Sequence, residues 1–120
     1  MDVSRIQDLF RATDDADADK LRDFLHPELQ LTMIGVEGVD EPFDLLGYLR
    51  FLAESVAYRD GRGERTEHVP TKIKIDGECI AVRGHLRITS ASEPDEYHPY
   101  FDILKLRDGK IVEYNIAYDI

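Results

Sequence analysis

Hydrophobic and polar positions alternate most clearly in two runs that flank Asp108-Gly109. An Asp-Gly pair tolerates the positive φ angles of a tight hairpin, and both runs are rich in β-branched and aromatic residues. Counting every second residue, one face of the first run contains a carboxyl group among apolar side chains: Tyr100, Asp102, Leu104 and Leu106. The corresponding face of the second run contains Val112, Tyr114, Ile116, Tyr118 and Ile120. The pattern predicts a hairpin within a sheet that lines a pocket with one carboxyl group.

Two short helices are predicted in the first quarter of the chain. The first runs to about Thr13, because apolar residues recur there at helical spacing: Val3, Ile6, Leu9 and Phe10. Either Asp2 or a capping box from Ser4 begins it. The second begins after Asp17, a good N-cap, and ends at His26-Pro27, because a residue before proline disfavours the helical region.

A strand and a third helix follow. From Glu28 the period changes to two, which predicts a strand with inner positions Leu29, Leu31 and Met33. A loop, with a short strand around residues 36–39, leads to a third helix. That helix is predicted to start at residues 40–42 and to run to about Tyr58. The charged, glycine-containing segment 59–65 is predicted to be a solvated loop.

Three long strands are then predicted to form an antiparallel meander. The first has Val69, Thr71, Ile73 and Ile75 on one face. Pro70 indicates that this strand lies at a sheet edge, because proline cannot donate to a ladder. Asp76-Gly77 turns the chain into a strand whose apolar face is Ile80, Val82, Gly84, Leu86 and Ile88. Helices followed by a meander predict an α+β fold: three N-terminal helices packed on a strongly curved antiparallel sheet that forms a cone-shaped pocket.

Two runs of the sequence resemble a known family. The run DILKLRDGKIVE, from Asp102 to Glu113, resembles the C-terminal signature of the nuclear transport factor 2-like superfamily, in its SnoaL-like polyketide cyclase and ketosteroid isomerase branch. The run DADKLRDFLHPEL, from Asp17 to Leu29, resembles that family's second helix and its exit into the first strand. The resemblance covers essentially the whole chain and implies a cystatin-like roll as a single domain of residues 1–120. It specifies the fold more than the activity, because the superfamily includes enzymes and plain binding modules.

Asp102 is the first candidate catalytic residue. The resemblance places it where ketosteroid isomerases have an aspartic acid that stays protonated in an apolar pocket and donates a hydrogen bond to an oxyanion. Desolvation beside Tyr100 and Tyr114 favours the neutral carboxyl, unless a cation pairs with it. The alternative also stays open: Asp102 pairs with Arg83 or Arg87 and only holds strands together.

The other groups of isomerase chemistry are missing. The resemblance puts Met33 at the position of the general base and Leu9 at that of the oxyanion tyrosine, and neither side chain can do that chemistry. The aspartate that SnoaL-like cyclases and epoxide hydrolases use falls at or near Ile116. The nearest acids, Glu113 and Asp119, have the opposite parity and are expected to face outward. Ketosteroid isomerisation is therefore disfavoured.

His98 is the second catalytic candidate, as a general base. It shares a nominal strand face with Asp102, and Pro99 between them is expected to introduce a bulge. The alternative is a solvated histidine at a strand end. The pocket wall is expected from side chains that either contact a ligand or simply fill the core: Phe10, Leu31, Met33, Tyr48, Tyr100, Tyr114, Ile116 and Tyr118.

Charge and composition limit the kinds of molecule that this protein is expected to bind. The formal charge of −10, from 15 basic and 25 acidic side chains, disfavours binding to a nucleic-acid backbone. No apolar run is long enough to span a membrane and no leader-like segment is recognisable, so a cytoplasmic location is expected. The single cysteine, Cys79, excludes an internal disulfide, and the histidine spacings match no metal motif. Neither a metal nor a cofactor is expected.

The sequence thus predicts a protein that binds a small, largely apolar metabolite, polycyclic ones included, in its cone. If it is an enzyme, it isomerises, cyclises or dehydrates that metabolite without a cofactor. The alternative is a catalytically silent binding or dimerisation module. Phe101 and Ile103 make the outer sheet face partly apolar, which predicts a homodimer through that face.

Overall fold

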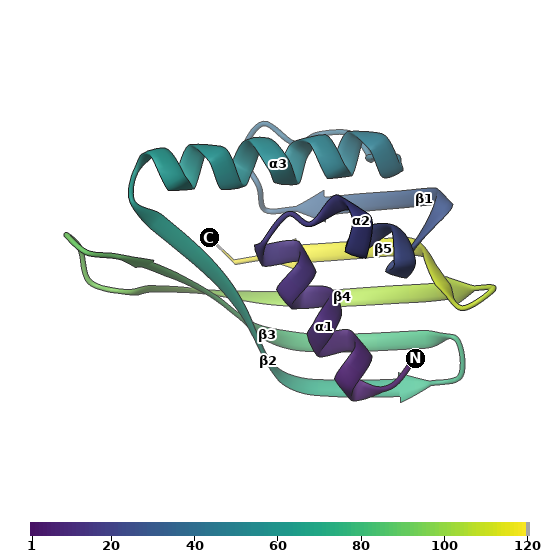
Figure 1. Cartoon of the computed structure of the whole chain (residues 1–120). Helices are drawn as coiled ribbons and strands as arrows, with labels where there is room; N and C mark the ends of the chain where they lie inside the picture. Colours follow the sequence, from purple (N-terminus) through teal and green to yellow (C-terminus); the bar gives the residue numbers. More distant parts are fainter. Residues whose placement is uncertain (120) are drawn as a thin grey trace.

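A computed structural model describes residues 1–119 and shows one five-stranded sheet with helices against it (Figure 1). The helices are α1 (Val3–Asp14), α2 (Ala18–Phe24) and α3 (Leu45–Gly61). The strands are β1 (Leu25–Ile34), β2 (Glu64–Asp76), β3 (Cys79–Ser90), β4 (Glu96–Arg107) and β5 (Lys110–Tyr118). This arrangement confirms the predicted α+β class. No helix among the described residues is long and apolar enough to cross a membrane.

The sheet is mixed rather than purely antiparallel. Its strand order is β1-β5-β4-β3-β2, and β1 pairs in parallel with β5 while the other neighbours are antiparallel. The chain leaves β1 through α3 and returns through three further strands before it pairs with β1, and a connection of this length permits parallel pairing. The sheet is open, with β1 and β2 as its edges. The edge position predicted for the strand with Pro70 is confirmed.

Aspartates cap the first two helices: Asp17 as predicted, and Asp2 rather than the alternative capping box from Ser4. The carboxylate of Asp2 accepts a hydrogen bond from the backbone N–H of Arg5 (2.8 Å), and that of Asp17 accepts from Lys20 (3.2 Å). Each satisfies a backbone donor that the helix itself leaves unpaired. Helix α2 ends at Phe24, slightly before the predicted end, because the next residue is already extended.

Helix α3 starts and ends later than predicted. Its N-cap is Asp44, whose carboxylate accepts a hydrogen bond from the first turn (2.7 Å). The predicted start at residues 40–42 is wrong because Phe43 is extended and forms an isolated bridge with Leu31. Residues 36–39 form a turn rather than a short strand. At the other end the helix continues to Gly61 and β2 begins at Glu64, so only residues 62–63 of the predicted loop 59–65 form a turn.

Strand β2 contains a β-bulge that breaks the predicted alternation. Its register against β3 shifts between Pro70 and Lys72. Pro70 pairs with Gly84 before the bulge and Ile73 with Val82 after it, so these side chains share the inner face. The single face predicted for Val69, Thr71, Ile73 and Ile75 is therefore wrong for Val69. Because the strand also starts earlier than predicted, His68 lies in it and points inward.

The β4–β5 hairpin is confirmed at Asp108-Gly109, where both φ angles are positive (55° and 77°). The predicted inner face of β4 is buried: Tyr100, Asp102, Leu104 and Leu106. A register shift beside Lys105 puts Ile111 in the core and leaves Val112 only half-buried, so the inner position predicted for Val112 is wrong. Ile120 lies outside the described residues.

The outer sheet face carries exposed aromatic side chains. Phe101 is 47% exposed and Tyr97 is 56% exposed. The homodimer through this face stays a prediction. If it forms, sedimentation should show a dimer for the natural sequence and a monomer for Phe101→Glu, with unchanged helix and strand content. A monomeric natural protein would contradict the prediction.

Gly84 is a point of close approach in the sheet. A Cβ there would lie 2.4 Å from the carbonyl oxygen of Val69 and 2.7 Å from the hydroxyl oxygen of Tyr100. Gly84→Ala should therefore lower the free energy of unfolding by roughly 1–3 kcal/mol in denaturant titrations. Gly61→Ala is the matched control, because a Cβ at Gly61 meets open space and alanine favours helix. Equal stability of Gly84→Ala and the natural protein would contradict the close approach.

Candidate functional site

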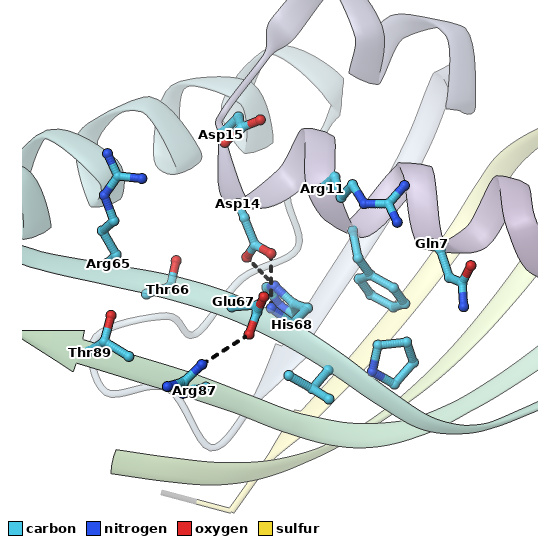
Figure 2. Close-up of a pocket in the computed structure, with 13 residues that line it drawn as sticks. Gln7, Arg11, Asp14, Asp15, Arg65, Thr66, Glu67, His68, Arg87 and Thr89 are labelled. Atoms are coloured by element: carbon cyan, nitrogen blue, oxygen red, sulfur yellow. Dashed lines mark hydrogen bonds and ion pairs between the residues drawn. The ribbon is translucent and has the colours of Figure 1, made fainter. Parts of the chain in front are cut away.

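A half-buried pair, Asp14 and His68, joins the end of α1 to β2 (Figure 2). Oδ1 of Asp14 lies 2.6 Å from Nδ1 of His68, and Oδ2 accepts the backbone N–H of the same residue at 2.9 Å. The two side chains are only 10% and 13% exposed. Because both carboxylate oxygens bind His68, the imidazole is held in one orientation.

The same contacts define the tautomer of His68. An ionised carboxylate only accepts hydrogen bonds, so Nδ1 carries the proton that faces Asp14. In the neutral ring Nε2 then has a lone pair, and the hydroxyl of Tyr118 lies 3.3 Å from it. The ring stacks on Phe10 at 5.2 Å and meets Tyr100 edge-on at 5.3 Å. A histidine oriented by a carboxylate, with Nε2 as acceptor, has the arrangement of a general base.

A cavity of about 170 Å³ lies beside His68. Its apolar wall comes mainly from α3 and consists of Met33, Val36, Tyr48, Phe51, Leu52, Val56 and Leu86. Its polar lining includes Asp14, Arg59, Thr66, His68 and Tyr118. For comparison, an apolar cavity of about 150 Å³ holds a benzene molecule. The space therefore suits a single ring with small substituents.

A wider groove of about 710 Å³ opens between α1 and β2 (Figure 2). It shares three lining residues with the inner cavity, namely Asp14, Thr66 and His68. Three arginines lie on its rim, Arg11, Arg65 and Arg87. Two of them are already paired, Arg11 with Asp8 and Arg87 with Asp95. The histidine thus stands between an open groove and a small, mostly apolar cavity.

Asp102 lies in the core rather than in the cavity wall. It is 1% exposed and does not line the cavity. The hydroxyl of Tyr114 donates to Oδ2 at 3.2 Å, while Oδ1 has no partner among the described residues. Burial raises the pKa of Asp102 from 3.8 to about 7, against the opposing effects of His68 and of the Tyr114 hydrogen bond. This carboxyl group is thus poised between its neutral and charged forms near neutral pH.

The alternative for Asp102, an ion pair with a neighbouring arginine, is not observed among residues 1–119. Arg87 binds Asp95 and Glu67, and Asp102 takes part in no ion pair within residues 1–119. Pairing of Asp102 with Arg83 or Arg87 is therefore wrong. The uncompensated burial explains why its pKa moves upward.

Tyrosines fill most of the interior that was expected to be open. Tyr48, Tyr100 and Tyr114 are 2–3% exposed, and burial followed by the charge of Asp102 raises the pKa of Tyr100 and Tyr114. Of the predicted pocket-lining residues, Met33, Tyr48 and Tyr118 line the cavity and Phe10 lines the groove. The others are buried and line neither space: Leu31, Tyr100, Tyr114 and Ile116. These four side chains therefore belong to the core and not to a pocket wall.

His98 lies on the inner face of β4, as predicted, but lines neither space. The register of β4 against β3 continues through Pro99, so the predicted bulge there is wrong. Nε2 of His98 lies 3.4 Å from a carboxylate oxygen of Glu96, and its side chain is 25% exposed. A catalytic role for His98 stays a prediction.

At the positions that the resemblance aligns with the family's catalytic groups, this protein has side chains that cannot transfer a proton. Leu9 and Ile116 are buried apolar side chains, and Met33 contributes only a thioether to the cavity. Glu113 and Asp119 are exposed, in agreement with the predicted outward parity.

Sequence analysis missed Asp14 and His68 because neither forms a recognisable motif with its neighbours. They lie 54 residues apart, and their contact depends on how α1 crosses the sheet. A local signal does exist in β2, where Thr66 and His68 alternate with the charged Arg65 and Glu67. An alternation count started at Glu64 places His68 on the inner face.

Several solved structures have the same fold. IdmH from Streptomyces antibioticus, assigned as a polyketide cyclase, aligns with a TM-score of 0.77 at 22% identity over 92% of this chain and 86% of that one. An M. tuberculosis LEH-like epoxide hydrolase aligns with a TM-score of 0.70 at 14% identity, over 98% and 81% of the chains. TerC, co-crystallised with polyporic acid, aligns with a TM-score of 0.76 at 19% identity, over 98% and 90%. At such identities the likeness establishes the fold alone.

The family is established by sequence. No protein with curated annotation matches the chain significantly. The family model described as "SnoaL-like domain" matches residues 6–114, which is most of the chain. The chain therefore belongs to the SnoaL-like domain family, within the nuclear transport factor 2-like superfamily that the terminal motifs resemble.

Proposed function

We propose that this protein binds a small, largely apolar organic molecule in the inner cavity and moves a proton on it with His68, without a cofactor. The single observation that carries the proposal is the Asp14–His68–Tyr118 arrangement in the cavity wall. It supplies an oriented base, and a hydroxyl that can donate a hydrogen bond, in the wall of a largely apolar cavity. The family and its fold neighbours, which include a protein assigned as a polyketide cyclase and an LEH-like epoxide hydrolase, are compatible with chemistry on small organic molecules.

The volume of the inner cavity limits the proposed ligand to a molecule with a single ring. About 170 Å³ is too small for the polycyclic molecules that the sequence left open. Tyr48 and Phe51 offer aromatic faces to such a ring, and Met33 adapts to its outline. The proposed ligand is therefore monocyclic, with at least one oxygen to meet the polar residues of the wall.

The reaction proposed is proton abstraction next to a carbonyl. A ligand oxygen takes the hydrogen bond from Tyr118, and Nε2 of His68 is then released to accept a proton from the neighbouring carbon. Asp14 stabilises the imidazolium that forms, because both its oxygens already face His68. The proton returns to another atom of the ligand. Isomerisation, cyclisation and dehydration all share this first step.

Asp102 acts on this chemistry through its charge, because it does not reach the cavity. After burial, the charge of Asp102 is the largest influence that raises the pKa of Tyr118. A weaker acid is a weaker hydrogen-bond donor, so ionised Asp102 weakens the Tyr118 donor and neutral Asp102 strengthens it. Asp102 thus influences the proposed reaction through its charge, and His68 replaces His98 as the proposed base.

A catalytically silent binding module is the second candidate. It is favoured by the apolar residues at the family's catalytic positions, Leu9, Met33 and Ile116, and by the buried place of Asp102. Such a protein would hold the same ligand in the same cavity without proton transfer. Binding and exchange measurements on the same molecules separate the two.

Replacing His68 tests the proposed chemistry. Hydrogen–deuterium exchange in D₂O, followed by NMR, should show that the protein accelerates exchange at the α-carbon of monocyclic ketones and enones. His68→Gln should lower that rate by about 100-fold or more, because the general base is lost. His98→Gln, the matched histidine outside the cavity, should stay within twofold. Ligand binding without any exchange would establish the silent module, and unchanged exchange in His68→Gln would contradict the assigned base.

Replacing Asp102 tests its buried, uncompensated state. The folded protein holds the Asp102 proton up to a pKa of about 7, whereas the unfolded chain releases it near 3.8. Between these values the unfolded state binds fewer protons, so stability falls as pH rises, by a total on the order of 4 kcal/mol. Asp102→Asn removes this dependence. Its free energy of unfolding, relative to the natural protein, should therefore increase from pH 4 to pH 8, whereas parallel pH profiles would contradict the raised pKa.

A further inference from the structure

Arg59 introduces a fixed positive charge into the inner cavity. Of the residues that line this space, two carry a formal charge at neutral pH, Asp14 and Arg59. Both oxygens of Asp14 are engaged by His68. Arg59 is therefore the charged group of the cavity wall that retains bonding capacity for a ligand.

The hydrogen bonds of Arg59 leave part of its guanidinium unused. Nη1 donates to Oε2 of Glu64 at 2.6 Å, and its side chain is 35% exposed. The other oxygen of Glu64 accepts from Nε of Arg62 at 2.5 Å. Within the described chain no hydrogen bond is formed by Nε or Nη2 of Arg59. Two guanidinium groups thus share one carboxylate, which leaves this cluster with a net positive charge.

The groups around Arg59 select the kind of anion. The hydroxyl of Ser55 already donates to the carbonyl of Phe51, whereas the hydroxyl of Thr66 lines the cavity as a further donor. A neighbouring pocket that shares Arg59 and Thr66 with the cavity is also lined by Asp15 and Asp60. These acids, with the formal charge of −10 on the chain, disfavour a dianion such as a phosphate ester. A planar monoanion matches the guanidinium fork best.

We propose that the ligand of the inner cavity is a monocyclic carboxylic acid whose carboxylate binds Arg59 while its ring packs on the apolar wall. This inference rests on the proposed function, because it specifies the molecule on which His68 acts. Arg59 and His68 then bind the two ends of one molecule. Two-point binding orients the reacting carbon toward Nε2, which a hydrophobic wall alone does not do.

Matched acids and amides test the carboxylate. Benzoate and phenylacetate are compared with benzamide and phenylacetamide, which have the same shape without the charge. Binding is measured by titration of amide signals in ¹H–¹⁵N NMR spectra, with the signals of His68 and Tyr118 as reporters of the cavity. The acids should bind about tenfold more tightly than their amides, and the preference should shrink as salt is added.

Two arginine variants assign the preference to one residue. Arg59→Gln should reduce the acid preference to less than twofold and leave amide binding unchanged. Arg62→Gln is the matched control, because Arg62 binds the same Glu64 but does not line the cavity, and it should keep the full preference. If Arg59→Gln lowers the melting temperature too far for titration, Arg59→Lys is used, and it should retain part of the preference because it keeps the charge.

The outcomes separate this inference from the proposed function. Equal binding of acids and amides, with both shifting the cavity signals, would overturn the carboxylate assignment and leave the cavity as a ligand site. An acid preference that survives Arg59→Gln would overturn the role of Arg59. If no acid or amide shifts the cavity signals at millimolar concentration, the ligand-binding function itself fails, and this inference fails with it.

Discussion

The hydrogen-bonded pair of Asp14 and His68 is the constraint on which the site depends. Asp14 is the last residue of α1, and His68 lies on β2, which is an edge strand of the sheet. The carboxylate of Asp14 accepts two hydrogen bonds, one from the ring and one from the backbone of His68, so helix and strand are fixed in relation to each other. An unsatisfied buried donor or acceptor costs about 1–3 kcal/mol, so neither partner is easily lost. Both residues line the groove and the inner cavity, so the pair positions the polar wall of each.

The rest of the interior shows how an open sheet with a helical cover leaves only a small cavity. The side chain of Tyr100 packs against Gly84 and fills the interior near β2. The side chain of Tyr114 fills the interior next to Asp102. What remains is a largely apolar cavity whose wall includes His68, Tyr118 and the cation of Arg59. The same crowding deprives Asp102 of water and of a counter-ion. A carboxyl group that is costly to bury in its charged form thus becomes a group whose charge changes near neutral pH.

Local physics made much of the fold predictable from the sequence. The caps Asp2 and Asp17 and the turn at Asp108-Gly109 depend on neighbouring residues only, and all three are confirmed. The burial of Asp102 also followed from strand alternation alone, whereas its state and its function did not. The α+β class follows from the order of helical and strand periods.

Features that depend on register or on distant contacts could not be predicted. The bulge after Pro70 inserts one residue into β2 and reverses the parity on one side, which concealed His68. The parallel pairing of β1 with β5 joins the first strand to the last. The contact between Asp14 and His68 spans 54 residues, so no window along the sequence contains both. The sequence therefore led to Asp102 and His98 as candidates, whereas the base proposed from the structure, His68, lies on β2.

The tautomer of His68 is the most direct test of this account. Long-range ¹H–¹⁵N correlation spectra of the histidine rings distinguish the protonated nitrogen from the unprotonated one at a pH where the ring is neutral. The account predicts that Nδ1 of His68 carries the proton and that Nε2 is the acceptor, with Asp14→Asn disturbing this assignment. A proton on Nε2, or signals averaged between the two tautomers, would contradict it.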